Sequence, residues 1–236
     1  MIVSRGRKTL ASAAVVLLAG VFLRPAQAQM MAIAGGQTSR AADYAYTGII
    51  DPLFDGKLGS GWFISPMLGL NRYSFKQNTT RFVGTQPSGS LGLGYSISGK
   101  AGSISLSVAE GYGQASISPY APAGSVHGGQ FFTEPEIWAQ VPLAPWLHIT
   151  ANGGYLTGLR SYWFVTYAAA TITPRISVGP EIDLGGGPNY RSQVVAARFN
   201  TQITQRLGAS LSLGGITNIP GSYHPYAGVG LTLPFQ

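Results

Sequence analysis

The chain has 236 residues, of which only 10% are charged, 33 are glycine and none is cysteine, and its mean hydropathy is +0.16. The lack of cysteine excludes a disulfide framework and a thiolate metal site. Soluble domains carry about 25% charged residues. The low charge, with no long apolar run after the N-terminal region, is typical of a membrane β-barrel, whose lipid-facing surface needs few charges.

Residues 1–28 are predicted to be a cleaved secretory signal peptide. Arg5, Arg7 and Lys8 precede a short apolar stretch over residues 10–23, and residues 26–28 (AQA) form a cleavage site. The apolar stretch is too short for a membrane anchor, which needs about 20 residues. Without residues 1–28 the chain keeps 11 basic and 8 acidic residues, so the net charge falls from +7 to +3. This charge gives no reason to expect nucleic-acid binding.

Residues 29–42 are small and polar and are predicted to form a periplasmic lead-in, so that the barrel domain covers residues 43–236. The first strand is expected over residues 44–52 and the second over 61–75. An irregular connection follows over 77–88, with some strand character around Phe82 and Val83. A loop rich in proline and glycine is expected over 118–129. Further strands are expected where apolar and polar residues alternate, around residues 91–97, 103–108, 131–141, 147–155, 162–172, 207–214 and 226–235.

The stretch from Thr173 to Thr204 shows this alternation most clearly and predicts an antiparallel hairpin. Successive side chains of a strand point to opposite faces, so residues of one parity share a face. Residues 185–189 (GGGPN) favour a turn between the two strands. One parity is apolar, with Ile176, Val178, Ile182, Leu184, Val195, Ala197, Phe199 and Ile203, and the other carries Arg175, Ser177, Glu181, Asp183, Arg198 and Asn200.

The alternation of apolar and polar residues alone does not decide which face is inside. A soluble β-sandwich shows the same alternation with its apolar face inside and its polar face outside. The last strand has Val229, Leu231, Leu233 and Phe235 on one face, which resembles the assembly signal of outer-membrane proteins. An open sheet edge in lipid would leave backbone groups unpaired, so the sheet is expected to close. We therefore predict an all-β, antiparallel outer-membrane β-barrel of about twelve strands, with ten as the alternative, and with its apolar face toward lipid.

With this facing, charged side chains of both signs point into the lumen. We expect them to pair across strands and hold the register, and the alternative is a narrow passage or binding surface lined by acids and arginines. Arg72 and His148 are further candidates for the interior. The predicted lumen-facing charged network consists of Glu134, Glu136, Arg175, Glu181, Asp183 and Arg198.

An enzyme is a less favoured alternative. The chain has His127, His148 and His224, and Glu134 and Glu136 are possible partners of His127. No G-x-S-x-G motif marks a nucleophile and no histidine pair has metal-ligand spacing, so no catalytic residue, metal or cofactor is predicted. A Ser-His-acid site that modifies lipid stays open as a possibility.

The aromatic residues allow two interpretations. Four tryptophans and several tyrosines lie in or near the predicted strands, where interfacial girdles of a membrane barrel are expected. Stacking of sugar rings along a polysaccharide path is the less favoured alternative. The tryptophans are Trp62, Trp138, Trp146 and Trp163.

Three stretches together resemble one known family. They are residues 43–48 (DYAYTG), residues 61–75 (GWFISPMLGLNRYSF), and residues 178–199, which begin VGPE and end RSQVVAARF. The set is similar to the cellulose biosynthesis protein BcsS family, although residues 185–190 are richer in glycine than the family leads us to expect. The resemblance supplies no catalytic residue. It implies an accessory role in cellulose production at the outer membrane or facing the periplasm. We therefore expect a non-enzymatic barrel in the outer membrane. Its expected partners are outer-membrane lipid, a glucan chain and other components of the cellulose synthase complex, without nucleic acid. A general small porin or structural barrel and a lipid-modifying barrel enzyme remain the alternatives.

Overall fold

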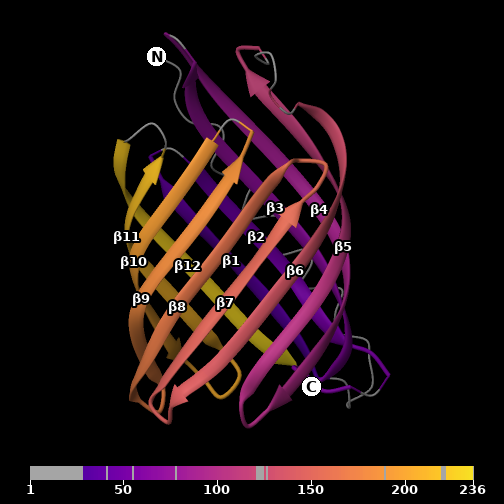
Figure 1. The fold of residues 1–236 in the computed structure, drawn as a ribbon, viewed down its shortest axis with the longest axis vertical. Helices are drawn as coiled ribbons and strands as arrows, with labels where there is room; N and C mark the ends of the chain where they lie inside the picture. The colour runs from indigo at the N-terminus through magenta and orange to yellow at the C-terminus, as the bar shows by residue number, and fades with distance from the viewer. Residues whose placement is uncertain are drawn as a thin grey trace.

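The computed structural model describes residues 29–235 apart from 41, 55, 78, 121–124, 126, 189 and 219–221. The predicted signal peptide lies outside the described residues. No helix of the described part is long and apolar enough to cross a membrane. Figure 1 shows the strands, which are β1 (Met30–Ser39), β2 (Ala42–Pro52), β3 (Gly61–Gln77), β4 (Thr80–Gly99), β5 (Gly102–Ser118), β6 (Gly128–Ala144), β7 (Leu147–Leu156), β8 (Ser161–Thr173), β9 (Ile176–Gly187), β10 (Tyr190–Gln202), β11 (Gly208–Asn218) and β12 (Ser222–Phe235).

These twelve antiparallel strands close into one barrel, which confirms the predicted fold class and the larger of the two predicted strand numbers. Each strand pairs with its neighbours in sequence, and β1 closes the barrel by pairing with β12 from Met30↔Phe235 to Ser39↔Tyr226. A closed sheet leaves no strand edge unpaired. Because the number of strands is even, β1 begins and β12 ends at the same end of the barrel, which we call the terminal rim.

The prediction of a loose lead-in over residues 29–42 is wrong, because Met30–Ser39 form β1 and the barrel begins there instead of at residue 43. Alanine, glycine and serine have low β-propensity, and β1 is built largely from such residues. The strand forms because both of its edges are paired, with β12 and with β2. Backbone pairing on both edges therefore stabilises β1 as a strand although its residues have low β-propensity.

The irregular connection expected over residues 77–88 is also wrong, since β4 already begins at Thr80 and runs for 20 residues. Glycine and proline at Gly84, Pro87 and Gly89 hide this strand in the sequence, but β3 and β5 pair with it on both sides. The predicted turn at residues 185–189 is shorter than expected, because β9 continues to Gly187, which pairs with Tyr190. Strands β3 to β6 rise above the others at the end opposite the terminal rim (Figure 1).

The apolar face of the strands points outward, as the alternation predicts. Leu106 and Val229 are 58% and 60% exposed on the outer surface, and Ile182, Leu184 and Val195 of the β9–β10 hairpin are also exposed. On the opposite parity, Glu181 is 1% and Ser212 is 4% exposed. The barrel therefore has an apolar exterior and a polar interior.

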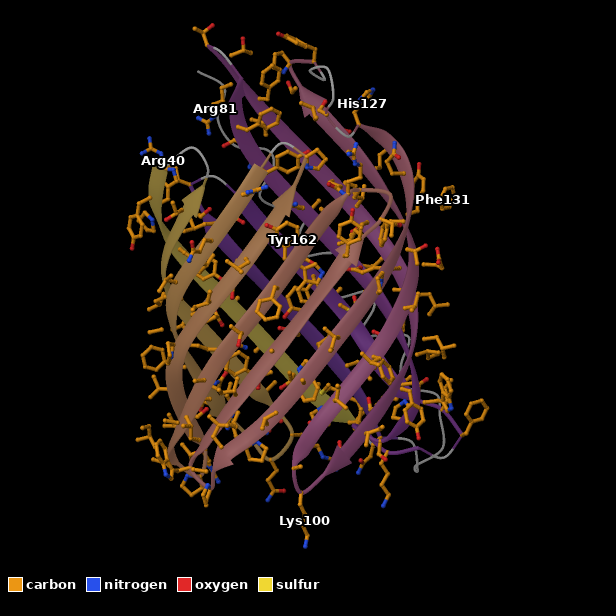
Figure 2. All side chains as sticks on the ribbon, viewed as in Figure 1. Arg40, Arg81, Lys100, His127, Phe131 and Tyr162 are labelled. Atoms are coloured by element: carbon orange, nitrogen blue, oxygen red, sulfur yellow. The ribbon has the colours of Figure 1, made fainter. Side chains whose placement is uncertain are left out.

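Pairs of outward-pointing aromatic rings mark two levels of the barrel wall, and Phe131, at the level away from the terminal rim, projects outward from the ribbon (Figure 2). Toward the terminal rim, the Trp62 and Tyr95 rings meet at 5.2 Å. Toward the other end, the Tyr112 and Phe131 rings meet at 5.1 Å. Paired levels of aromatics around an apolar band are the pattern of interfacial girdles. Trp146 is also exposed, whereas Trp163 belongs to the lumen and donates to a carboxylate there.

Candidate functional site in the barrel lumen

Arg198 of β10 is the centre of a group of polar side chains inside the barrel. Its Nη1 donates to Glu181 Oε2 at 2.5 Å, its Nε to Asn200 Oδ1 at 2.9 Å and its Nη2 to Ser210 Oγ at 3.1 Å. The guanidinium carbon also lies 4.3 Å from the centre of the Tyr167 ring. The Arg198 side chain is thus held along its edges by hydrogen bonds and on one face by an aromatic ring.

The strand register explains why this ion pair forms. Glu181 lies opposite Ala196, and Arg198 lies opposite Gly179, so the two charged side chains are diagonal neighbours on the same face of the β9–β10 pair. Diagonal neighbours are within reach of long side chains. The two residues opposite them are an alanine and a glycine, which leave room for the guanidinium to reach the carboxylate. Glu181 is almost completely buried, while the Arg198 side chain keeps 22% of its surface exposed to the lumen.

A second contact joins β12 to β9 across the two strands between them. Tyr226 Oη lies 3.1 Å from Gln37 Oε1 and 3.3 Å from Asp183 Oδ2, and its single proton can be donated to one of these acceptors at a time. The Tyr226 ring packs in a small apolar cluster with Val194, Ala196 and Ile216. The apolar cluster fixes the ring, and the ring places its hydroxyl beside Asp183.

Glu134 and Glu136 of β6 have neutral partners. Trp163 Nε1 donates to Glu134 Oε1 at 2.7 Å, and Ser107 Oγ donates to Glu136 Oε2 at 3.0 Å. The Trp163 contact crosses β7 above Gly154, where an added Cβ would lie 3.0 Å from Trp163 Nε1 and 3.1 Å from Glu134 Oε1. Gly154 therefore makes this crossing possible.

We call Glu134, Glu136, Glu181, Asp183 and Arg198, with the partners just described, the lumen belt. It contains five of the six predicted residues, and four of these are carboxylates against one guanidinium. Arg175 is placed differently, since it lies in the turn between β8 and β9 and is exposed at the terminal rim. Arg72 shares the outward parity of β3 and is exposed, so it does not join the interior, whereas His148 faces the lumen beside Thr150.

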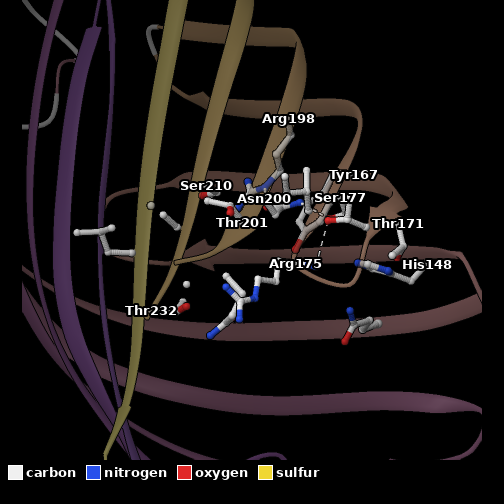
Figure 3. Close-up of a pocket in the computed structure, with 18 of the residues that line it drawn as sticks. His148, Tyr167, Thr171, Arg175, Ser177, Arg198, Asn200, Thr201, Ser210 and Thr232 are labelled. Atoms are coloured by element: carbon white, nitrogen blue, oxygen red, sulfur yellow. Dashed lines mark hydrogen bonds between the residues drawn. The ribbon is translucent and has the colours of Figure 1, made fainter. Parts of the chain in front are cut away.

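Below the lumen belt, toward the terminal rim, lies a cavity of about 690 Å³ that we call the vestibule (Figure 3). Arg198, Tyr46 and Tyr167 form its inner end, and residues at strand ends, such as Thr173 and Gln202, form its mouth. Among the described residues that line it there is no carboxylate. The polar and aromatic side chains that line it are Tyr46, Gln140, His148, Tyr167, Thr171, Thr173, Arg175, Ser177, Arg198, Asn200, Thr201, Gln202, Ser210 and Thr232.

The comparison with protein families identifies the barrel. The family model of cellulose biosynthesis protein BcsS matches residues 31–235, which is the described barrel from the second residue of β1 to the end of β12. The chain belongs to the BcsS family. This confirms the resemblance found in the sequence, and the match includes β1, which sequence reasoning had left outside the barrel domain.

Solved structures similar to this BcsS-family chain are outer-membrane barrels. An outer membrane channel from Pseudomonas putida F1 has a TM-score of 0.53 at 10% identity, covering 90% of this chain and 97% of that chain. The translocator domain of the autotransporter NalP from Neisseria meningitidis has a TM-score of 0.51 at 11% identity, covering 95% and 94%. The transport unit of the autotransporter AIDA-I from Escherichia coli has a TM-score of 0.51 at 12% identity, covering 95% and 97%. These likenesses show the fold alone. No relative is found among curated proteins.

The three histidines of the BcsS-family barrel lie in different parts of the fold, before β6, in β7 and in β12. His127 is exposed before β6, where its Nδ1 lies 3.2 Å from the Ser125 carbonyl oxygen, while His148 lines the vestibule. His224 has the inward parity of β12 toward the opposite end. Within the described residues no histidine is hydrogen-bonded to a carboxylate, and no three histidine or acidic side chains are grouped to hold a metal ion. Glu134 and Glu136, considered as partners for His127, contact Trp163 and Ser107 instead.

Sequence reasoning did not find the aromatic members of the lumen belt. Trp163 and Tyr167 lie on β8, where aromatic and β-branched residues occupy both parities, so the sequence did not show which parity faces inward. Tyr226 could have been predicted to face the lumen, because it lies on the inward parity of the last strand, where apolar and polar residues alternate clearly. Gln37 lies on β1, which was not predicted as a strand.

Proposed function

We propose that this BcsS-family chain is a non-enzymatic outer-membrane β-barrel that serves cellulose biosynthesis or secretion as an accessory protein. The observation that carries the proposal is the family match over residues 31–235 of a closed barrel with an apolar exterior. The family supplies the connection to cellulose, and the two faces of the barrel support a site in lipid. Its partners are outer-membrane lipid, a glucan chain and components of the cellulose synthase complex.

The outer surface supports insertion in a bilayer. An apolar band lies between the two aromatic levels. The outward-pointing Glu110 lies at the edge of this band, two residues before Tyr112, and accepts a hydrogen bond from Thr133 Oγ1 at 2.8 Å. Beyond this level the outward residues of β4 and β5 become polar, with Arg81, Thr85 and Ser116. If the chain is secreted and then inserted from the periplasm, the start of β1 and the end of β12 can stay on the periplasmic side without crossing the membrane. The terminal rim therefore faces the periplasm in our proposal, and the raised ends of β3 to β6 face outward.

The lumen belt supports a structural role without chemistry. The charges of Glu181 and Arg198 satisfy each other, Glu136 accepts a hydrogen bond from the neighbouring strand β5, and Glu134 accepts one from Trp163 of β8, across β7. A buried charge left without its partner is strongly unfavourable, so these contacts hold adjacent strands in register. Within the described residues no histidine is hydrogen-bonded to a carboxylate, so the lumen belt gives a Ser-His-acid site for a lipid-modifying reaction no support.

A deletion strain tests the proposal. The amount of extracellular cellulose and the place where the polymer accumulates are measured with and without a plasmid that carries the wild-type gene. We expect less extracellular cellulose and more polymer kept within the envelope, with recovery on complementation. Unchanged cellulose together with reduced uptake of small solutes would contradict this function and indicate a general porin.

A further inference from the structure

We propose that the vestibule is a binding site for a neutral, polyhydroxylated saccharide, specifically a segment of a β-linked glucan chain that enters from the terminal rim. This inference rests on the proposed function and adds the site and the class of ligand to it. Pockets that bind small ligands usually measure about 300–1,000 Å³. The vestibule, with a volume of about 690 Å³, falls within this range.

The lining favours a ligand that both donates and accepts hydrogen bonds without carrying charge. Most of its polar side chains are hydroxyls and amides, which act as donors and acceptors. Sugar hydroxyls have the same double capacity. Figure 3 shows Thr171, Ser177, Asn200, Ser210 and Thr232 arranged around the space on several strands. Asn200 and Ser210 accept from Arg198 and Asn200 donates to Ser177 Oγ, but each of the two serine hydroxyls can still donate and the Asn200 amide keeps one hydrogen. A chain of sugar units could therefore meet hydroxyl and amide groups on more than one wall at once.

The charges around the vestibule argue against a cationic ligand and give little support to an anionic one. The lining residues that the structure describes include no carboxylate, so a cation would have no counter-ion among them. The positive charge of Arg198 is already matched by Glu181, and three of its nitrogens are engaged with protein acceptors. This leaves Arg175 at the exposed mouth, where solvent and salt screen its charge. A neutral saccharide therefore fits the charges of the vestibule better than a cationic or an anionic ligand.

The inner end of the vestibule supplies a fixed surface. Tyr167 is held against the Arg198 guanidinium, and Tyr46 stacks on Tyr44 with ring centres 5.7 Å apart. A Cβ at Gly35 would lie 2.7 Å from the Tyr46 ring, so Gly35 allows this ring to lie close against the wall. Rings and hydrogen-bonding groups that are already fixed lose little entropy when a ligand binds.

The test uses the full barrel, refolded in detergent, and measures binding of cellohexaose by isothermal titration calorimetry. Maltohexaose, with α-linkages, and an oligogalacturonate, with carboxylates, are the comparison ligands. We expect saturable binding of cellohexaose and weaker binding of both others. Absence of saturable cellohexaose binding, or tighter binding of oligogalacturonate, would overturn the assignment to a neutral glucan.

Variants locate the binding site. Thr171→Trp fills the vestibule from β8 and is expected to weaken cellohexaose binding by at least about tenfold, equivalent to 1.4 kcal/mol or more. Gln202→Ala removes one amide at the mouth with little risk to folding. We expect it to weaken cellohexaose binding by about threefold, which is less than the effect of Thr171→Trp. Gln193→Ala on the outer face of β10 is the matched control and should bind as wild type does. Equal binding by wild type, Thr171→Trp and Gln202→Ala would place the ligand elsewhere and overturn the inference.

The two proposals fail in different ways. If cellohexaose does not bind but the deletion strain loses extracellular cellulose, the accessory function stands and the vestibule assignment is wrong. If cellohexaose binds in the vestibule but deletion leaves cellulose unchanged, the site stands and the proposed function is wrong.

Discussion

Arg198 and Glu181 form an ion pair of 2.5 Å in which the carboxylate is 1% and the guanidinium side chain 22% exposed. The pair joins β9 to β10, and the further contacts of Arg198 with Ser210 and Tyr167 extend it to β11 and β8. One side chain therefore ties four consecutive strands together inside the barrel.

Loss of either partner of this pair should destabilise the barrel. Breaking a buried pair by removing one partner costs about 3–5 kcal/mol, because the other charge stays buried without compensation. We expect Glu181→Gln and Arg198→Gln to lower the urea concentration at the midpoint of unfolding in detergent. Exchanging the two charges, with Glu181→Arg and Arg198→Glu in one chain, should recover part of the loss. Arg191→Gln is the control, because Arg191 lies at an exposed position of β10, the strand that carries Arg198. A wild-type midpoint for both single variants would show that the pair does not stabilise the fold.

The outer surface should reject a charge only within the apolar band. Leu106 and Ser116 are both exposed on the outward parity of β5, but Ser116 lies beyond the Tyr112 level. We expect Leu106→Arg to reduce the amount of assembled, heat-modifiable barrel in the membrane, since arginine at the midplane costs about 2–4 kcal/mol. Ser116→Arg should assemble as wild type does. Equal assembly of the two variants would contradict the assignment of the apolar band to lipid.

Gly179 is expected to tolerate no side chain. It lies opposite Arg198, and a Cβ there would collide with the Ala168 carbonyl oxygen of β8, which as a backbone atom has little freedom to move. Overpacking of this kind costs about 1–3 kcal/mol. Gly179→Ala should therefore lower the melting temperature of the barrel, followed by circular dichroism. Gly99→Ala, where a Cβ meets nothing within 4 Å, should leave it unchanged. Similar melting temperatures for both variants would disagree with the close approach of β8 and β9.

The orientation of the barrel can be tested with single cysteines, because the chain has none of its own. Lys100 and His127 lie at opposite ends of the barrel (Figure 2). A membrane-impermeant maleimide added to intact cells should label His127→Cys and should reach Lys100→Cys only after the outer membrane is permeabilised. The reverse labelling pattern would place the terminal rim outside the cell.

The sequence was informative where side-chain chemistry and strand period agree. In β9 and β10 the charged and apolar residues alternate strictly, so the hairpin and the shared face of Glu181, Asp183 and Arg198 could be predicted. Parity could not say which acid Arg198 meets, because that depends on the register, which places Glu181 diagonally from Arg198 and lets Asp183 meet Tyr226. This information lies in the pairing of strands rather than in either strand alone.

Other features depend on neighbours distant in the sequence. Met30–Ser39 reads as a small polar segment and becomes a strand because β12, nearly two hundred residues later in the chain, needs a partner to close the barrel. Arg175 shares the inward parity of β9 but lies in the turn before that strand, so it lines the mouth of the vestibule instead of joining the lumen belt. The contact of Trp163 with Glu134 depends on Gly154 of the strand between them.

The central claim is that the barrel supports cellulose output without chemistry of its own. The most direct test measures the amount of extracellular cellulose per assembled barrel in cells carrying Glu181→Gln or Arg198→Gln. Barrel abundance is measured by heat-modifiable gel mobility in the same outer-membrane fractions. We predict that cellulose falls only in proportion to the assembled barrel, so that the ratio stays at its wild-type value. A variant that assembles at the wild-type level and stability but abolishes cellulose export would contradict this account and make the lumen belt a working surface of the passage.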